Sequence, residues 1–283
     1  MKGLTLLSPA KINLFFRVLR KREDGYHDIA SLFQMVDFCD ILSISIHPSE
    51  DVFSTNNTSL RWDQSNLIYR AVELFKQKTD LHFFVQIDLQ KKIPMQAGLG
   101  GGSGNAATIL YALNKLLNTE VAEATLASWG STLGADVPSF FSAGRVFCEG
   151  IGEKLTYVAK KQEKYWILKP KNLALSTPEV FSKLCLNQIS SRSPYDLLET
   201  FAQGCGEPVN DLEETAFKIL PILQSFKKRF LDLGFHHVVM TGSGTAFIGF
   251  GDVKPFQLSD VDVWHVESVY RPSHDWYTSG SVY

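Results

Sequence analysis

Glycine is concentrated in one short stretch of this chain, and that stretch predicts an anion site. It runs from residue 94 to residue 107, reads PMQAGLGGGSGNAA and holds five glycines in 14 residues. An extended apolar run at 83–89 precedes it, and a helical pattern follows it. Glycine permits positive φ and close approach of a ligand, and the unpaired N–H groups and dipole of a helix start attract anions. We therefore expect nucleotide phosphates to bind here.

Three kinds of phosphate loop compete for this stretch. A Walker A loop has the form GxxxxGK[ST], and no lysine follows these glycines. The dinucleotide fingerprint GxGxxA does occur, at Gly102, Gly104 and Ala107. It also needs an acidic residue after a second strand about 20 positions on, where Glu120 and Glu123 lie in a helical pattern instead. A dinucleotide oxidoreductase is thus a weak alternative, and a glycine loop with serine at the helix start and no Walker lysine is the third.

Polar residues elsewhere could act on a bound phosphate. Residues 8–18 predict a strand on which Lys11 and Asn13, two apart, share one face between apolar neighbours. This pair could line a site or face solvent at a sheet edge, and the residues alone leave both open. Asp136 lies in a turn just before Pro138, where an aspartate is more often a cap than a catalyst.

Alternating strands and helices must position these residues. The patterns predict strands at 3–18, 40–47, 83–89, 140–147, 165–168, 238–240 and 246–250, and helices at 66–78, after the glycine loop, at 120–133, from 176, and from 210 to 226 with a division at Pro221. The lysine-rich segment 154–164 indicates a boundary between two lobes. The polar tail 271–283 is expected to be frayed.

The composition excludes several classes of protein. A chain of 283 residues with 45% apolar and 20% charged residues suits a globular protein with one large or two modest domains. A net charge of −2 gives no basic field for nucleic acid. There is no run of about 18 apolar residues and no CxxC pair among the four cysteines, and we expect no targeting segment. We expect a cytoplasmic protein, a monomer or weak homodimer, without a nucleic-acid or membrane partner.

Three motifs resemble, in order, those of the GHMP kinase superfamily, which includes galactokinase and the homoserine, mevalonate and phosphomevalonate kinases. They are SPAKINL at 8–14, the glycine stretch at 94–107 and TGSGT at 241–245. Further blocks resemble the branch that acts on cytidylyl methylerythritol: KINL at 11–14, DGYH at 24–27, the triple glycine at 100–102, GADVP at 134–138 and EGIGE at 149–153. The resemblance implies ATP-dependent phosphorylation of that substrate's 2-hydroxyl, on the methylerythritol phosphate route to isoprenoid precursors.

The resemblance also implies the fold, an α/β fold of the α+β, two-lobed GHMP kinase type. A ribosomal-S5-like N-terminal lobe with the nucleotide cleft would comprise residues 1–155, and a ferredoxin-like C-terminal lobe residues 156–283. ATP, its Mg²⁺ and the small-molecule substrate would meet between them. The alternatives are another kinase of the superfamily, such as a mevalonate or homoserine kinase, and a non-catalytic nucleotide-binding protein. The DGYH block argues against the first, and the presence of Lys11 and Asp136 against the second.

Residue roles follow from the same resemblance. Asp136 would take the hydroxyl proton, and Lys11 would orient the hydroxyl and stabilise charge. The residues implied for ATP are Asn66, Pro94, Gly98, Leu99, Gly100, Gly101, Gly102, Ser103, Gly104 and Asn105. Those implied for the substrate are Asn13, Tyr26, His27, Thr177, Phe181, Gly242 and Ser243, with Tyr26 and Phe181 on the two faces of cytosine and His27 at its edge. No protein ligand is implied for Mg²⁺, and the family's Ser-Ser-Asn is Ser103-Gly104-Asn105 here, one hydroxyl fewer.

Overall fold

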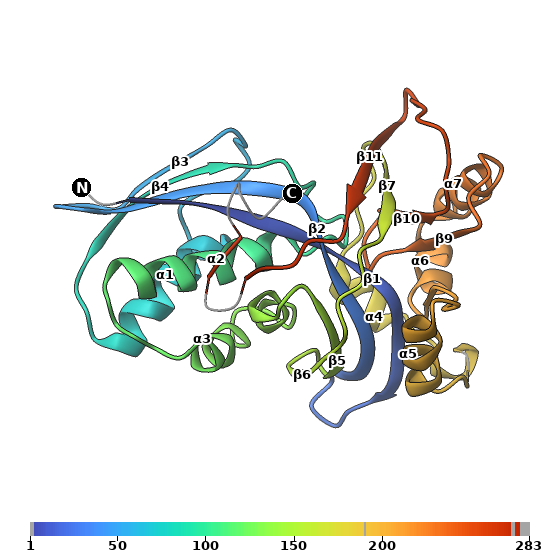
Figure 1. Ribbon diagram of the computed structural model, residues 1–283, viewed down its shortest axis with the longest axis horizontal. Helices are drawn as coiled ribbons and strands as arrows, with labels where there is room; N and C mark the ends of the chain where they lie inside the picture. Colours follow the sequence, from blue (N-terminus) through green and yellow to red (C-terminus); the bar gives the residue numbers. More distant parts are fainter. Residues whose placement is uncertain (1–2, 190, 273–274, 278–283) are drawn as a thin grey trace.

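Two sheets with helices packed on them make up the computed structural model, which describes residues 3–189, 191–272 and 275–277 (Figure 1). The arrangement is α+β, which confirms the predicted fold class. The strands are β1 (Gly3–Lys21), β2 (His27–His47), β3 (Val52–Thr55), β4 (Phe84–Gln90), β5 (Arg145–Gly150), β6 (Lys154–Tyr157), β7 (Lys164–Pro170), β8 (Val209–Asn210), β9 (His237–Met240), β10 (Phe247–Phe250) and β11 (Val261–Glu267). The helices are α1 (Leu67–Thr79), α2 (Gly101–Leu116), α3 (Glu123–Gly130), α4 (Thr177–Ser182), α5 (Pro194–Gln203), α6 (Glu213–Ile219), α7 (Ile222–Leu231) and the 3₁₀ turns η1 (Val137–Phe141) and η2 (Leu186–Gln188).

The larger sheet is built on the long antiparallel hairpin of β1 and β2. Its order is β3-β4-β2-β1-β8. The edge of β2 away from β1 pairs with β4 over residues 41–47 and with β5 over residues 29–34. The register of β1 against β2 shifts between Pro9 and Ala10, which places a β-bulge next to Lys11.

Helices α1, α2 and α3 cover one face of this sheet (Figure 1). The residues of β4 alternate between exposed and buried, so the other face of the sheet is open there. Along β1 from residue 8 to residue 18 every residue is buried, because the second sheet covers the remaining face. Lys11 and Asn13 are only 2% and 1% exposed, which excludes the solvent-facing sheet edge as their position.

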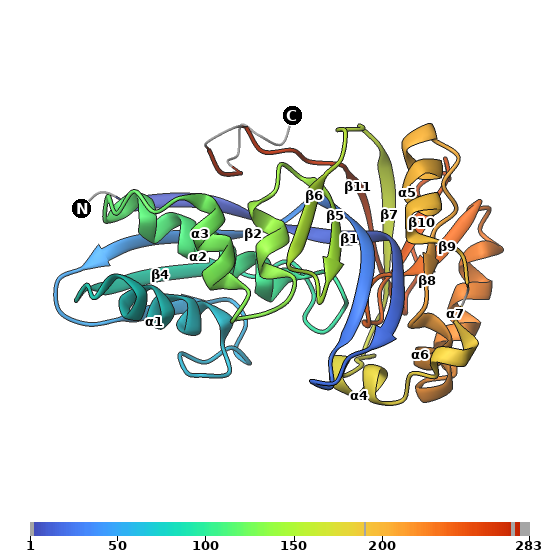
Figure 2. The same cartoon turned by 90° about the horizontal axis from the view of Figure 1, so that it is seen from below.

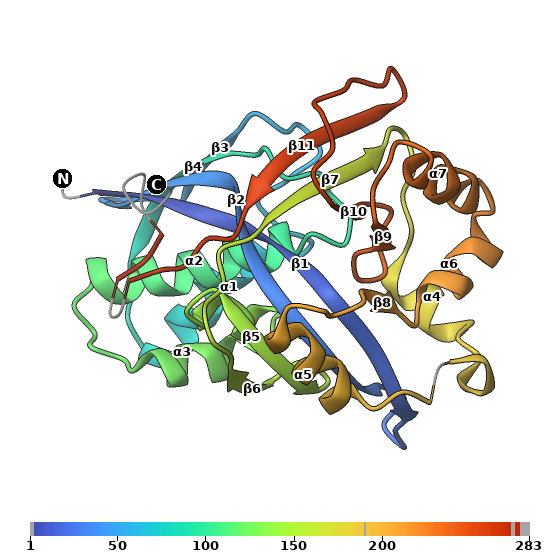
Figure 3. The ribbon, with the colours of Figure 1, turned by 45° about the vertical axis from the view of Figure 1, so that its right-hand side comes forward.

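The second sheet has the order β11-β7-β10-β9 with antiparallel neighbours, and Figure 3 shows it beside β1. One face packs on β1 through Ile167 and Ile248, and the other packs on α6 and α7 through Leu168 and Phe247. A ferredoxin-like unit has two helical crossovers. Here β7 reaches β9 through helices, whereas the described residues 251–260 join β10 to β11 without one. No helix among the described residues has the length and apolar character to cross a membrane.

Two local predictions are wrong. The strand expected over 140–147 begins only at Arg145, because the backbone around Pro138 closes the 3₁₀ turn η1, in which Ser139 N–H donates to the carbonyl of Asp136. The tail is not frayed at Trp276 and Tyr277, which are fully buried in the core of the first lobe. Figure 2 shows the chain after β11 running back over that lobe. The rest of the tail call, at 273–274 and 278–283, lies outside the described residues.

Candidate active site

A cavity of about 990 Å³ lies where the two sheets meet. Its walls are the glycine loop at 94–103, Lys11 from β1, Asp136, the tip of the β1–β2 hairpin, the start of α4 and the β9–β10 turn. All but two of the residues expected from the sequence line it, and the two exceptions are Asn13 and Gly104. The fold therefore gathers segments from both ends of the chain around one cleft.

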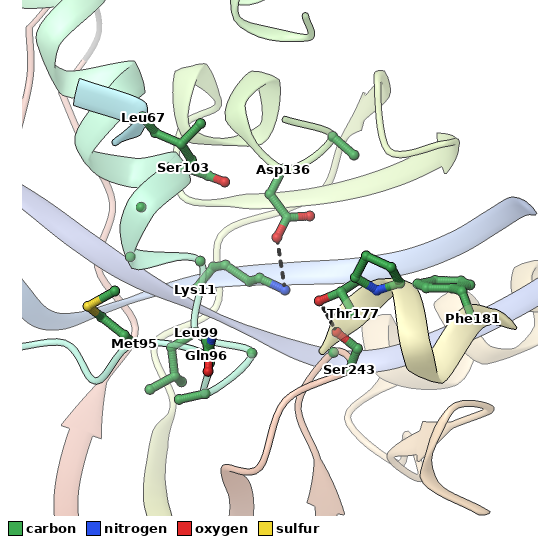
Figure 4. A pocket seen from close by; sticks show the side chains of 18 of the residues that line it. Lys11, Leu67, Met95, Gln96, Leu99, Ser103, Asp136, Thr177, Phe181 and Ser243 are labelled. Carbon is green, nitrogen blue, oxygen red and sulfur yellow. Dashed lines mark hydrogen bonds and ion pairs between the residues drawn. The ribbon is translucent and has the colours of Figure 1, made fainter. Parts of the chain in front are cut away.

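Lys11 and Asp136 form an ion pair inside this cleft. The Nζ of Lys11 lies 3.4 Å from Oδ2 of Asp136, with 3% of the lysine side chain and 32% of the aspartate side chain exposed (Figure 4). Asp136 immediately precedes η1, and the backbone N–H of Lys11 donates to the carbonyl of Leu99 at 3.0 Å. Asp136 has no partner nearby in the sequence, and the fold supplies one from a strand 125 positions earlier.

The glycine loop has the backbone of an anion site. Gly98 and Gly100 have φ of 81° and 67°, and Gly100 is the N-cap of α2. The first internal bond of the helix runs from Gly104 N–H to the carbonyl of Gly100, so the N–H groups of 101–103 lack helical acceptors. The loop is also close-packed, since a Cβ on Gly100 would lie 2.7 Å from Cγ of Lys11. Glycine here brings the lysine and the helix start together.

Asn105 and Asp40 anchor the loop from behind. The Nδ2 of Asn105 donates to Oγ of Ser8 and to Oδ2 of Asp40, both at 3.0 Å. Asp40 is fully buried and also pairs with Nζ of Lys91 at 2.7 Å. Burial lowers the pKa of Lys91, and the charge of Asp40 opposes that shift. Lys91 also lines the cavity and was not predicted as a site residue. Its position between the strand at 83–89 and the glycine loop was the available indication.

At the other end of the loop, the cavity wall is largely apolar. Leu60, Leu67 and Met95 lie there beside Asn66. The side chain of Asn66 caps α1, accepting from Ile68 N–H at 3.0 Å and donating to a backbone carbonyl at 2.9 Å. This end has the apolar lining that suits a nucleotide base.

The opposite end of the cleft carries aromatic rings. Tyr26 is 61% exposed at the hairpin tip, and the ring centroids of His27 and Phe181 lie 5.3 Å apart. Burial, and then the charge of Lys21, lower the pKa of His27 below its ordinary value, which favours the neutral ring at pH 7. Thr177 lies at the start of α4, and its hydroxyl shares a hydrogen bond of 2.6 Å with that of Ser243 (Figure 4).

Asn13 lies behind Lys11 rather than on the cavity wall. Its Oδ1 accepts from Nζ of Lys11 at 2.8 Å, and its Nδ2 donates to Oγ of Ser31 at 2.8 Å. Gly104 faces β1, where a Cβ would lie 3.0 Å from the carbonyl of Pro9. The structure therefore keeps these two predicted residues near the site but out of contact with the cavity.

Comparison with known proteins agrees with this fold. The family model described as "GHMP kinases N terminal domain" matches residues 66–144, which include the glycine loop and Asp136. The 4-diphosphocytidyl-2-C-methyl-D-erythritol kinase of Protochlamydia amoebophila is 41% identical over 283 residues, covering 99% of this chain and 94% of the relative. A crystal structure of 4-(cytidine 5'-diphospho)-2C-methyl-D-erythritol kinase aligns with a TM-score of 0.78 at 32% identity, covering 93% of this chain and 98% of the other.

The chain thus has the fold of a GHMP kinase. A homoserine kinase from Cytophaga hutchinsonii shares the fold, with a TM-score of 0.70 at 16% identity and 95% and 96% of the two chains covered. Sequence similarity is higher to one group of these kinases. This chain belongs to the family of 4-diphosphocytidyl-2-C-methyl-D-erythritol kinases. The resemblance seen in the sequence is confirmed.

Proposed function

We propose that this chain transfers the γ-phosphoryl group of ATP to the 2-hydroxyl of 4-diphosphocytidyl-2-C-methyl-D-erythritol, giving the 2-phosphate and ADP, on the methylerythritol phosphate route to isoprenoid precursors. Family membership supports the reaction. The observation that carries it is the Lys11–Asp136 pair, 3.4 Å apart, on the wall of the cavity that the glycine loop also lines.

In this proposal, the oxygen of the substrate's 2-hydroxyl bonds to the γ-phosphorus of ATP, and Asp136 receives the proton of that hydroxyl. The bond between the γ-phosphorus and the oxygen that bridges it to the β-phosphate breaks, and ADP leaves. Lys11 orients the hydroxyl and offsets the negative charge on the transferred group. Phosphoryl transfer depends mainly on positioning and electrostatics, so a partly exposed carboxylate beside a buried ammonium is sufficient. The N–H groups at the start of α2 hold the ATP phosphates.

The two ends of the cleft divide the remaining contacts. The apolar end with Leu67 and Met95 takes adenine, and the aromatic end takes cytosine between Tyr26 and Phe181. The neutral ring of His27 can donate to or accept from the edge of cytosine. The rings of His27 and Phe181, with centroids 5.3 Å apart, together form the aromatic wall against which cytosine would pack.

Mg²⁺ accompanies ATP in this reaction, and the donor set fits it. Among the described residues no cluster of three or more His, Cys, Asp or Glu side chains could hold a metal alone. Mg²⁺ needs only one or two protein oxygens when nucleotide phosphates and water supply the rest. Ser103 and Asp136 line the cavity on neighbouring segments, and a Cβ on Gly134 would lie 3.6 Å from the Ser103 hydroxyl. We assign the hydroxyl oxygen of Ser103 and a carboxylate oxygen of Asp136 as ligands of the ion, which neutralises phosphate charge when bound.

We place the division between the lobes near residue 155, giving 1–155 and 156–283, with Trp276 and Tyr277 of the second segment packing back into the core of the first. The support is that β6 of the first sheet ends at Tyr157 and β7 of the second begins at Lys164.

We also propose a cytoplasmic location. The four cysteines are unpaired, as is usual in a reducing compartment.

A coupled ADP-release assay tests the function. The purified chain is given ATP and Mg²⁺ with 4-diphosphocytidyl-2-C-methyl-D-erythritol, and in parallel with mevalonate and with homoserine. The proposal requires ADP release with the cytidylyl substrate and none above background with the other two alcohols. Faster turnover on mevalonate or homoserine would assign the chain a different alcohol, and no ADP release with any of the three would leave it a nucleotide-binding protein.

A further inference from the structure

The hydroxyl of Thr241 joins three parts of the site that come from different elements. Its Oγ1 accepts from the backbone N–H of Asn13 at 3.1 Å and donates to Oδ1 of Asn13 at 3.1 Å. The same oxygen lies 3.4 Å from the carbonyl of Gly98. Thr241 follows β9 in the second sheet and is fully buried. One side chain of the C-terminal part thus fastens β1 and the glycine loop together.

The amide of Asn13 can have only one orientation. The hydroxyl of Ser31 donates its proton to the carbonyl of Phe15 at 2.6 Å, so it can only accept from Asn13. The Nδ2 of Asn13 must therefore face Ser31, at 2.8 Å, and Oδ1 must face Lys11 and Thr241. Asn13 and Ser31 are 1% and 0% exposed, so water does not compete for these bonds.

The direction of the Lys11 ammonium depends on this amide. Nζ donates to Oδ1 of Asn13 at 2.8 Å, which is closer than its 3.4 Å approach to Asp136. With Oδ1 held by Thr241, the ammonium also reaches Asp136 across the ion pair drawn in Figure 4. Without the Thr241 hydroxyl, the amide keeps its bond to Ser31 but loses the support at Oδ1, so the ammonium that bonds to Oδ1 is held less firmly.

We propose that Thr241 is a positioning residue whose hydroxyl, acting through Asn13, holds the Lys11 ammonium in its productive direction. This inference rests on the proposed kinase function. Thr241 and Asn13 do not line the cavity, in contrast to the neighbouring Gly242 and Ser243, so their effect passes through Lys11 rather than through a ligand. The arrangement makes the catalytic lysine of the first lobe depend on the second lobe.

The test compares Thr241→Val with Thr245→Val. Thr245 is in the same turn and is also fully buried, but its hydroxyl bonds the carbonyl of Leu173 at 3.1 Å, away from Lys11. We expect Thr241→Val to lower kcat about tenfold, less than the ~10²-fold loss typical of a charge-stabilising group, with KM for ATP within about twofold. Thr241→Ser restores kcat because it keeps the hydroxyl, and Thr245→Val keeps the kcat of the unmodified chain.

A double-mutant cycle separates positioning from general structural damage. If Thr241 acts through the lysine, Thr241→Val lowers kcat further by less than about twofold in a Lys11→Ala background. An undiminished tenfold loss in that background, an equal loss in Thr245→Val, or an unchanged kcat in a folded Thr241→Val protein would each overturn the inference. A chain that releases no ADP before any substitution fails the proposed function instead.

Ser31→Ala tests the same inference should Thr241→Val not fold. It removes the acceptor that fixes Nδ2 of Asn13 and leaves the cavity wall intact, because Ser31 lies on the neighbouring strand β2 and does not line the cavity. The expected result is again a kcat lowered about tenfold, with KM for ATP unchanged. A kcat equal to that of the unmodified chain would show that the orientation of the amide does not matter.

Discussion

Gly98→Ala tests whether backbone contact between the lobes sets the position of the glycine loop. A Cβ on Gly98 would lie 1.9 Å from the carbonyl oxygen of Thr241 and 3.1 Å from the N of Gly244, whereas real Cβ contacts essentially never fall below 3.0 Å. The loop and the β9–β10 turn would have to separate by about 1 Å. Alanine would also be strained at the φ of 81°, at a cost of about 1–2 kcal/mol.

The separation changes activity as well as stability. A misplacement of about 1 Å at a reacting centre costs up to ~10²-fold in rate, so kcat/KM for ATP should fall about 10- to 100-fold. The change is measured by ADP release at varied ATP and saturating cytidylyl substrate. Urea unfolding should give a free energy lower by more than the ~1–2 kcal/mol of backbone strain, because the contact between lobes is lost too.

Gly234→Ala is the matched control. Gly234 has φ of 101°, and no atom lies within 4 Å of the position of its Cβ, so the substitution adds backbone strain without a clash. We expect it to lower stability by about 1–2 kcal/mol and to leave kcat/KM for ATP unchanged. If the Gly98 and Gly234 variants have equal stability and kcat/KM values within twofold of each other, contact with the turn does not position the loop.

Three further changes probe the chemistry, the cytosine end and the tail. Asp136→Asn should lower kcat at least ~10²-fold in the ADP-release assay, and near-normal turnover would remove Asp136 from the mechanism. Tyr26→Ala should raise KM for the cytidylyl substrate about tenfold and leave KM for ATP unchanged, since only one base stacks there; equal rises would make Tyr26 structural. Trp276→Ala should lower the urea unfolding free energy by about 3–5 kcal/mol, because it empties a fully buried site, and a loss below about 1 kcal/mol would contradict that packing.

Local structure could be predicted from the sequence where all the residues that determine it lie in one continuous segment. The glycine stretch alone predicted a helix start that binds an anion, and α2 begins within it at Gly101. The periodicity of 66–78 located α1 to within a residue, with Asn66 as its N-cap. In both cases neighbours in the chain are also neighbours in space, so short-range rules were enough.

Partners far apart in the chain could not be read in the same way. The spacing of Lys11 and Asn13 was compatible with a site or with a solvated edge, and only the second sheet, built from residues after 163, decided for burial. The polar composition of the tail predicts fraying, whereas Trp276 and Tyr277 are buried. Its aromatic pair was the available signal: Trp276 stacks on Tyr111 with ring centroids 4.7 Å apart and donates to the carbonyl of Leu7.

The glycines of the loop serve two purposes, and Gly104 separates them. The superfamily pattern has serine at this position, which suggested a hydroxyl lost from the phosphate site. A Cβ at 104 would instead lie 3.0 Å from the carbonyl of Pro9 and 3.1 Å from the Ser8 hydroxyl, so the position faces β1. Gly100, one helical turn earlier, faces Lys11 of the same strand. These two glycines allow the start of α2 to pack closely against β1, the strand that carries Lys11. The hydroxyl of this segment that lines the cavity is that of Ser103.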